Sequence, residues 1–210
     1  MADFTFFTNP MSRGQIARWA LHEAGADYEQ VLVPWDDKPA ALLDANPMGK
    51  VPTIVHHSGT GDHVVTEAAA ICAYLAEACP KADLYPTDDE AADYYRWLFF
   101  AAGPVEQAIT ARNMGWEVPE GREGMAGFGS YERTISALDS HFAENDFVCG
   151  DRFTMADVYV GSQVDWGLTF GTMPPEESFV AYAEMLQDRA AYKAAKKIDG
   201  DLIAAAKKDD

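Results

Sequence analysis

The hydrophobic pattern of the chain changes character once, near residue 80, and this change limits the folds open to it. Before that point, short β-prone runs alternate with stretches whose apolar residues recur at helical spacing. A linker rich in Pro, Lys, Asp and Thr follows at 79–89, and beyond it only helical periodicity is found. We therefore expect an α/β domain over residues 1–80 and an all-α domain over residues 88–210.

The first domain has the element order βαβ followed by αββα. We expect strands at 4–7, 31–33, 53–55 and 64–65, and helices at 13–24, 39–44 and 67–78. Gly25 ends the first of these helices as a C′ glycine. A βαβ unit brings two parallel strands together through a crossover, whereas the short turn at 58–61 predicts an antiparallel hairpin.

The second domain consists of long helical runs. We expect helices at about 90–112, 129–144, 155–170 and 177–198. Pro104 falls inside the first of them and should kink it. Aromatic side chains encircle more than one face of this same helix, which indicates burial on two sides, by the core and by a partner subunit; they are Tyr94, Tyr95, Trp97, Phe99 and Phe100.

Composition excludes several classes of function. With 16 basic and 34 acidic residues the formal net charge is −18, which disfavours nucleic acid and anionic membrane surfaces as partners. No apolar run reaches the ~20 residues of a membrane span, and the N-terminus does not resemble a signal peptide. Three cysteines without CxxC or zinc spacing predict a reduced, cytoplasmic protein. Three histidines near the hairpin turn have no acidic or Cys partner in the pattern, so we expect no metal site.

The first candidate site is the turn Thr8–Gln15, between the first strand and the first helix. Ser12 and Gln15 have the spacing of a capping box, so one interpretation is that Ser12 only caps the helix. The other is that the helix N-terminus binds an anion such as a thiolate. A hydroxyl group can accept from the backbone and still donate to a bound sulfur, so Ser12 is a candidate for both roles.

Two further segments are candidates for ligand binding. Pro52 opens the third strand, either as an ordinary trans edge proline or as a cis proline. In the second case, and if the edge of the sheet is open, the N–H and C=O of Val51 can pair with an extended peptide ligand by strand addition. Glu67 lies in the first turn of its helix, where any carboxylate is favoured by the helix dipole. There it can also hold an ammonium group while backbone N–H groups bind a carboxylate, which suits an amino-acid head group.

In combination and in this order, these segments resemble the glutathione transferase family. Asn46–Thr53 is similar to the family's cis-proline segment, and Glu67–Leu75 to the helix start that binds the γ-glutamyl group. Asn9–Arg13, continuing to Arg18–Leu21, resembles the catalytic turn of bacterial serine-type members. Gly150–Asp157 resembles the family's helix-capping segment, in which Thr154 and Asp157 would form a capping box.

The resemblance implies a thioredoxin-like N-terminal domain plus an all-α C-terminal domain, glutathione as substrate, no metal, and a homodimer. It assigns the activation of the thiol to Ser12, with Asn9 as the alternative. The glutathione-binding residues would be Arg13, Lys50, Val51, Pro52, Glu67 and Ala68.

One departure concerns position 68, where the family usually has Ser and this chain has Ala. A hydrogen bond to a charged group contributes about 1.5–3 kcal/mol, so its loss would weaken glutathione binding unless a backbone N–H suffices. The apolar second substrate is expected between the domains, with Asn113, Met114 and Trp116 as candidates. For Met114 and Trp116 the alternative is ordinary core packing.

These observations predict a glutathione transferase that conjugates the thiolate to small apolar electrophiles, as in detoxification. Two alternatives stay open. One is a non-catalytic member of the family that binds glutathione or serves as a scaffold, an alternative that the alanine at position 68 keeps open. The other is a glutathione-dependent reductase or isomerase. The first helix starts without a cysteine, which argues against the disulfide-reductase branch of the superfamily.

Overall fold

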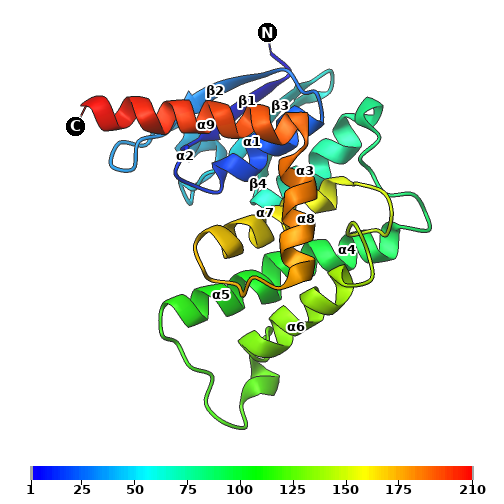
Figure 1. Cartoon of the computed structure of the whole chain (residues 1–210). Coiled ribbons are helices and arrows are strands. Elements are labelled where there is room, and N and C mark those ends of the chain that lie inside the picture. Colours follow the sequence, from blue (N-terminus) through cyan, green and yellow to red (C-terminus); the bar gives the residue numbers. More distant parts are fainter. Residues whose placement is uncertain (1, 210) are drawn as a thin grey trace. The chain divides into compact units, whose positions relative to one another are not determined.

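A computed structural model describes residues 2–209 of the chain, which divides into two compact units (Figure 1). The first unit comprises Met1–Tyr85 together with Asp188–Asp210, and the second is Pro86–Gln187. The sequence placed the boundary near residue 80, a few residues before the structural one, and it assigned everything after residue 88 to one helical domain. In the structure the C-terminal helix belongs to the first unit.

The first unit is built on a four-stranded mixed sheet with the order β2-β1-β3-β4. Its strands are β1 (Phe4–Thr8), β2 (Tyr28–Leu32), β3 (Thr53–Ser58) and β4 (Gly61–Thr66). β1 and β2 are parallel, and β3 and β4 form the antiparallel hairpin, as the element order predicts. β2 starts three residues earlier than expected. β3 lies inside the sheet, so the interpretation of Pro52 as an edge proline is wrong.

Helices cover both faces of this sheet. Successive side chains of β1 point in opposite directions, so its apolar residues Phe6 and Phe7 need to be covered on both sides. Phe6 lies under the guanidinium of Arg18 in α1 (Gly14–Glu23), with 5.3 Å from its ring centre to Arg18 Cζ. Phe7, on the other face, packs with Val33 and with Leu42 of α2 (Ala40–Ala45). α3 (Ala68–Ala78) packs against α1. Gly25 has φ +61° just after α1 ends, which confirms the predicted C′ glycine.

The last two helices of the chain were expected to be one, at 177–198, and the structure divides them. α8 (Glu177–Gln187) belongs to the second unit, and α9 (Ala190–Asp209) packs along α1 in the first. Arg189, at the break, donates two hydrogen bonds to the carboxylate of Glu23, at 2.6 and 2.8 Å. No Gly or Pro lies between these two helices, so no local signal in the sequence predicts the break.

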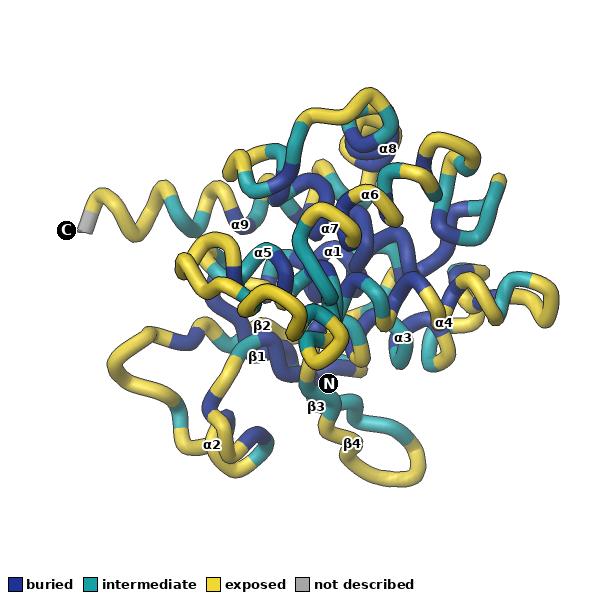
Figure 2. Tube along the Cα trace, turned by 90° about the horizontal axis from the view of Figure 1, so that it is seen from below, coloured by how far each residue is buried: buried dark blue, intermediate teal, exposed yellow. Residues whose placement is uncertain are grey.

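The second unit is helical, as predicted. Its helices are α4 (Ala91–Phe100), α5 (Glu106–Asn113), α6 (Tyr131–Phe142), α7 (Met155–Thr169) and α8. Between α4 and α5 the five-residue stretch Ala101–Val105 is π-helical and contains Pro104, so the expected irregularity is present. α7 is buried along most of its length and forms the centre of this unit (Figure 2).

Aromatic side chains of α4 divide between two environments. Tyr94 and Trp97 are buried in the unit's core. Tyr95 and Phe99, on another side of the helix, are 40% and 68% exposed in this single chain. Among residues 2–209, no helix has the length and apolar composition needed to cross a membrane.

Candidate functional site

The three segments singled out in the sequence meet at one end of the sheet. Strand register sets this arrangement, since Phe7 at the end of β1 pairs with Thr53 at the start of β3, and Thr53 pairs with Thr66 at the end of β4. The turn after β1, the loop before β3 and the helix start after β4 therefore follow one another along this edge. Adjacent strands are about 4.8 Å apart, so the outer two segments are separated by roughly 10 Å. A tripeptide can span that distance.

In the turn after β1, the hydroxyl of Ser12 is held by two backbone groups. It donates to the carbonyl of Asn9 at 2.7 Å and accepts from the N–H of Gly14 at 2.9 Å. The residue is half-buried. To donate to a bound sulfur, the hydroxyl must turn its hydrogen away from Asn9, while the contact from Gly14 can stay in place.

The capping box predicted for Ser12 and Gln15 is not formed. The residue that caps α1 is Arg13, so the helix begins one residue later than the pattern implies. The side chain of Gln15 donates to the carbonyl of Pro10 at 2.6 Å and does not return to the N–H of Ser12, which donates to Asn9 instead. Ser12 is thus part of the turn and not of the helix.

Asn9 is the scaffold of this turn. Its Nδ2 donates to the carbonyl of Val33 at 3.0 Å, and its Oδ1 accepts from the N–H of Met11 at 2.9 Å. The side chain is 8% exposed. Gly14 allows the helix to start close to β1, because a Cβ there would lie 2.1 Å from Thr8 Oγ1. Both ends of the Asn9 amide are therefore engaged, whereas Ser12 is the more accessible polar group.

The second segment, before β3, is held together by Asn46. Its Nδ2 donates to the carbonyl of Lys50 and to Thr53 Oγ1, both at 3.1 Å. The Val51–Pro52 peptide bond is cis, as expected from the family resemblance. Pro52 is buried and Val51 is half-buried, and both precede the first residue of the β3 ladder. The side chain of Lys50 is exposed.

The third segment differs from the expectation in one detail. Glu67 precedes α3 and lies outside its first turn, with φ 65° and ψ 119°, an uncommon conformation for a residue with a side chain. Such strain costs of order 1–3 kcal/mol and clusters at ligand-binding sites. Ala68 is 7% exposed. The N–H of Ile71 donates to the carbonyl of Glu67, so the N–H groups of the three preceding residues lie ahead of the helical ladder.

The edge where the three segments meet carries two cationic side chains besides the carboxylate of Glu67. The side chains of Arg13 and Lys50 are exposed, and the positive ends of the α1 and α3 dipoles lie beside them. With a Debye length of about 8 Å at physiological salt, distant carboxylates are largely screened.

The residues expected to bind the second substrate lie after α5, in the second unit. Trp116 lines a cavity of about 480 Å³ together with Arg112, Phe128 and Tyr131. Asn113 and Met114 are neighbours along the chain and are exposed, but they are not part of the lining. Trp116 and Met114 are 64% and 61% exposed, so the alternative of core packing is wrong for both.

The histidines near the hairpin have partners within the protein. His57 contacts Asp62, His63 contacts Thr60, and His56 Nδ1 lies 2.8 Å from the hydroxyl of Tyr74. Within residues 2–209, His, Cys, Asp and Glu side chains form no group of three suited to a metal ion. The three cysteines are free thiols, and burial raises the pKa of Cys149 to about 12.

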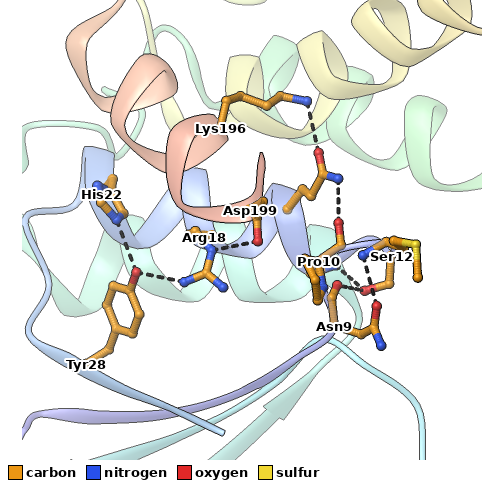
Figure 3. Close-up of polar contacts among 11 residues, drawn as sticks. Asn9, Pro10, Ser12, Arg18, His22, Tyr28, Lys196 and Asp199 are labelled. Carbon is orange, nitrogen blue, oxygen red and sulfur yellow. Dashed lines mark hydrogen bonds and ion pairs between the residues drawn. The ribbon is translucent and has the colours of Figure 1, made fainter. Parts of the chain in front are cut away.

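Sequence reasoning missed two residues near the turn, Lys196 and Asp199, both in α9. Lys196 of α9 donates to Gln15, and Gln15 in turn contacts the turn at Pro10 (Figure 3). A buried ion pair between Arg18 and Asp199 lies beside them. The position of Arg18 on an otherwise apolar helix face was the one sequence signal that this residue is buried and paired. No local pattern identifies Asp199 as its partner, because the two residues lie far apart in the chain.

Two family models match the chain over its two units. The glutathione S-transferase N-terminal domain matches residues 11–78, and the glutathione S-transferase C-terminal domain matches residues 106–166. The chain belongs to the glutathione transferase family. Its fold is the family's thioredoxin-like α/β domain joined to an all-α domain.

Relatives and solved structures agree with this assignment. The chain is 24% identical over 201 residues to glutathione S-transferase GstA of Escherichia coli O157:H7, covering 92% of this chain and 98% of the relative. A glutathione transferase of Methylococcus capsulatus has a TM-score of 0.75 and 26% identity, covering 94% of this chain and 98% of that one. A sphingomonad glutathione S-transferase in complex with glutathione has a TM-score of 0.72 and 26% identity, with 93% and 98% covered.

Proposed function

We propose that this chain is an active glutathione transferase that binds glutathione at the edge where the three segments meet and ionises its thiol at the start of α1. The observation that carries the proposal is the register that brings the Ser12 turn, the Val51–Pro52 segment and the Glu67–Ala68 segment to one end of the sheet. In this arrangement the backbone of Val51 pairs with the cysteinyl unit, as in strand addition. Glu67 holds the ammonium group of the γ-glutamyl unit, and the N–H groups at the start of α3 receive its carboxylate.

Ser12 is the proposed donor to the sulfur. A free thiol has a pKa near 8.5, and lowering it by about two units makes the thiolate the main form at neutral pH. This shift requires that the site stabilise the thiolate relative to the thiol by roughly 2.7 kcal/mol. A serine hydroxyl donating to an anion and the positive end of α1 together supply an amount of this size. Asn9 keeps the turn in shape, since both ends of its side chain are already bonded.

The proposed reaction is a nucleophilic substitution or addition at carbon. The thiol proton leaves to solvent, and the sulfur lone pair forms a bond to an electrophilic carbon. With an aryl halide, the carbon–halogen electron pair leaves with the halide. We propose that a small apolar electrophile binds in the cavity that Trp116 lines together with Phe128 and Tyr131; Asn113 and Met114 lie outside its lining.

Oligomeric state and location are also proposed. A homodimer would cover the exposed side of α4 that carries Tyr95 and Phe99. Free thiols are the form that a reducing cytoplasm maintains.

A non-catalytic glutathione-binding protein is the second candidate, and one contact favours it. In the structure the hydroxyl of Ser12 donates to the carbonyl of Asn9 and is not directed outward. If glutathione leaves that hydrogen bond intact, the ligand is bound without activation of its thiol.

The experiment that separates the two combines titration calorimetry with turnover of chlorodinitrobenzene. We expect glutathione binding by the wild type and by Ser12→Ala, with kcat/KM lowered by about tenfold to a hundredfold in the variant. Retained full turnover would remove Ser12 from the mechanism. Binding without any turnover across a panel of electrophiles would favour the second candidate.

A further inference from the structure

The contacts between α9 and α1 continue into the turn that carries Ser12. Lys196 Nζ donates to Gln15 Oε1 at 3.1 Å, and Gln15 Nε2 donates to the carbonyl of Pro10 at 2.6 Å. Figure 3 shows this as one line of contacts from the C-terminal helix to the turn. Pro10 lies between Asn9 and Ser12, so the last contact holds the backbone of the proposed catalytic turn.

The chemistry of the three groups determines how the Gln15 amide is oriented. An ammonium group can only donate and a carbonyl can only accept. An amide between them must present its oxygen to Lys196 and its nitrogen to Pro10, and either contact alone would orient it the same way. The ammonium charge also polarises the amide and strengthens its hydrogen bond to Pro10.

Buried contacts on both sides hold Lys196 in place. Asp199, about one turn further along α9, pairs with Arg18 at 2.9 Å, and their side chains are 2% and 0% exposed. Tyr192, about one turn before it, packs edge-on against the ring of Trp19 with 5.1 Å between ring centres. The position of the ammonium group is therefore determined by the docking of α9 as a whole.

We propose that Gln15 and Lys196 are positioning residues for thiol activation, and that α9 stabilises the catalytic turn through them. This inference rests on the proposed function and deepens it. Neither side chain has to touch glutathione, because they act through the carbonyl of Pro10 on the geometry of Asn9 and Ser12. Lys196 also brings a positive charge toward the turn in a chain whose net charge is −18.

The discriminating variant is Gln15→Glu. A glutamate keeps a partner for Lys196 but replaces the donor to Pro10 with a carboxylate oxygen, which repels the carbonyl. We expect α9 to stay docked and the pKa of the bound glutathione thiol, read from the ultraviolet band of ionised sulfur, to rise by about half a unit to one unit. We expect kcat at neutral pH to fall about 1.5- to threefold, in proportion to the thiolate fraction, with KM for glutathione changed by less than about twofold.

Two variants of Lys196 provide an independent measurement. Lys196→Met removes the ammonium charge that polarises the amide, and we expect the thiol pKa to rise in the same direction as in Gln15→Glu but by less. Lys196→Arg retains a donor for Gln15 Oε1 and should restore the wild-type value. These variants decide the question even if Gln15→Glu does not fold, because Lys196 is partly exposed.

Lys197→Met is the matched control, because it removes the same charge from the next residue of α9, where the ammonium group donates to the exposed Asp201. It should leave the docking of α9 and the thiol pKa unchanged. If Gln15→Glu and Lys196→Met behave like this control, the positioning role is wrong although the proposed function stands. If wild-type protein binds glutathione without ionising it, the proposed function itself is wrong.

Discussion

The starts of α1 and α7 have the same sequence pattern and use it differently. Thr154 and Asp157 form a complete capping box, in which Asp157 Oδ2 accepts from the N–H of Thr154 at 2.8 Å. Ser12 and Gln15 have the same spacing but do not close on each other. In α7 the two side chains bond each other's backbone, whereas in α1 Ser12 bonds within the turn and Gln15 bonds Pro10 and Lys196.

The difference arises from one residue of helix register. Thr154 is the capping residue of α7, whereas at α1 the cap is Arg13, one position after Ser12. Gln15 is then the second and not the third residue after the cap, and its side chain extends to the carbonyl of Pro10. A shift of one residue in the cap thus leaves the same spacing unclosed at α1, where we propose that Ser12 serves a ligand.

The largest effect on stability is expected at α7. Asp157 accepts from the backbone N–H groups of Val148 and Thr154 and from the hydroxyl of Tyr182. Asp157→Ala would leave these buried donors without a partner and lower the free energy of unfolding by about 3–5 kcal/mol. Denaturant titration measures this, with the exposed Asp151→Ala as a control that should change it by less than about 0.5 kcal/mol. Equal losses in both variants would contradict the role of the box.

The largest effect on activity is expected from Gly14→Ala. The new Cβ would lie 2.1 Å from Thr8 Oγ1 and 3.1 Å from the carbonyl of Asn9, so the turn must move. We expect kcat/KM to fall about a hundredfold, because reacting groups misplaced by about 1 Å lose that much. Gly200→Ala in α9, where a Cβ meets nothing within 4 Å, should leave kcat/KM unchanged. A fully active Gly14→Ala enzyme would show that the turn tolerates displacement.

A third helix start, that of α4, allows a test by pH. Arg152 donates to Glu90 at 2.9 Å and lowers the pKa of this carboxyl to about 2, with help from the N–H of Thr87. Because the folded pKa is below the unfolded value, the stabilisation is complete above about pH 4.5 and is lost as the pH falls toward 2.

Glu90→Gln should therefore lower the free energy of unfolding by about 1–2 kcal/mol at pH 7, and by progressively less below pH 4.5. Unfolding measured from pH 7 to pH 3 tests this, with the exposed Asp201→Asn as a control that shows little effect. A difference between wild type and Glu90→Gln that stays constant with pH would contradict the assignment.

The smallest effect on stability is expected at Ser12. Ser12→Ala removes the acceptor of the Gly14 N–H in a half-buried turn, which should cost only about 0.5–1 kcal/mol. A large loss measured by denaturant titration would mean that Ser12 serves the fold, as Asp157 does, and the contrast between the two helix starts would disappear.

Local patterns were sufficient to predict the first unit's sheet. Two β-prone runs with a segment of helical periodicity between them predicted the parallel pair, and the Gly-containing turn at 58–61 predicted the hairpin. Together these elements placed Ser12, Pro52 and Glu67 at strand ends. The bounds of β2 and α1 were off by one to three residues, since capping and register depend on contacts that the sequence does not display.

Contacts between distant residues were outside the reach of the sequence. Arg18 and Asp199 are 181 residues apart, so no local rule predicts that the last helix returns to the first unit. The positions of Met114 and Trp116 were also not determined, because helical periodicity stops before them and exposure cannot be read without it. The pairing of Arg18 with Asp199 and the exposure of Met114 and Trp116 both depend on tertiary structure, which local secondary-structure propensity does not determine.

The central claim is that the turn at the start of α1 stabilises ionised sulfur. Its most direct test is a pH titration of the ultraviolet absorbance of the protein–glutathione complex, with Ser12→Ala measured alongside. The account predicts a thiolate band at neutral pH in the wild type, with an apparent pKa about two units below that of the free thiol, and a higher pKa in the variant. Saturating glutathione that binds without such a band would contradict it.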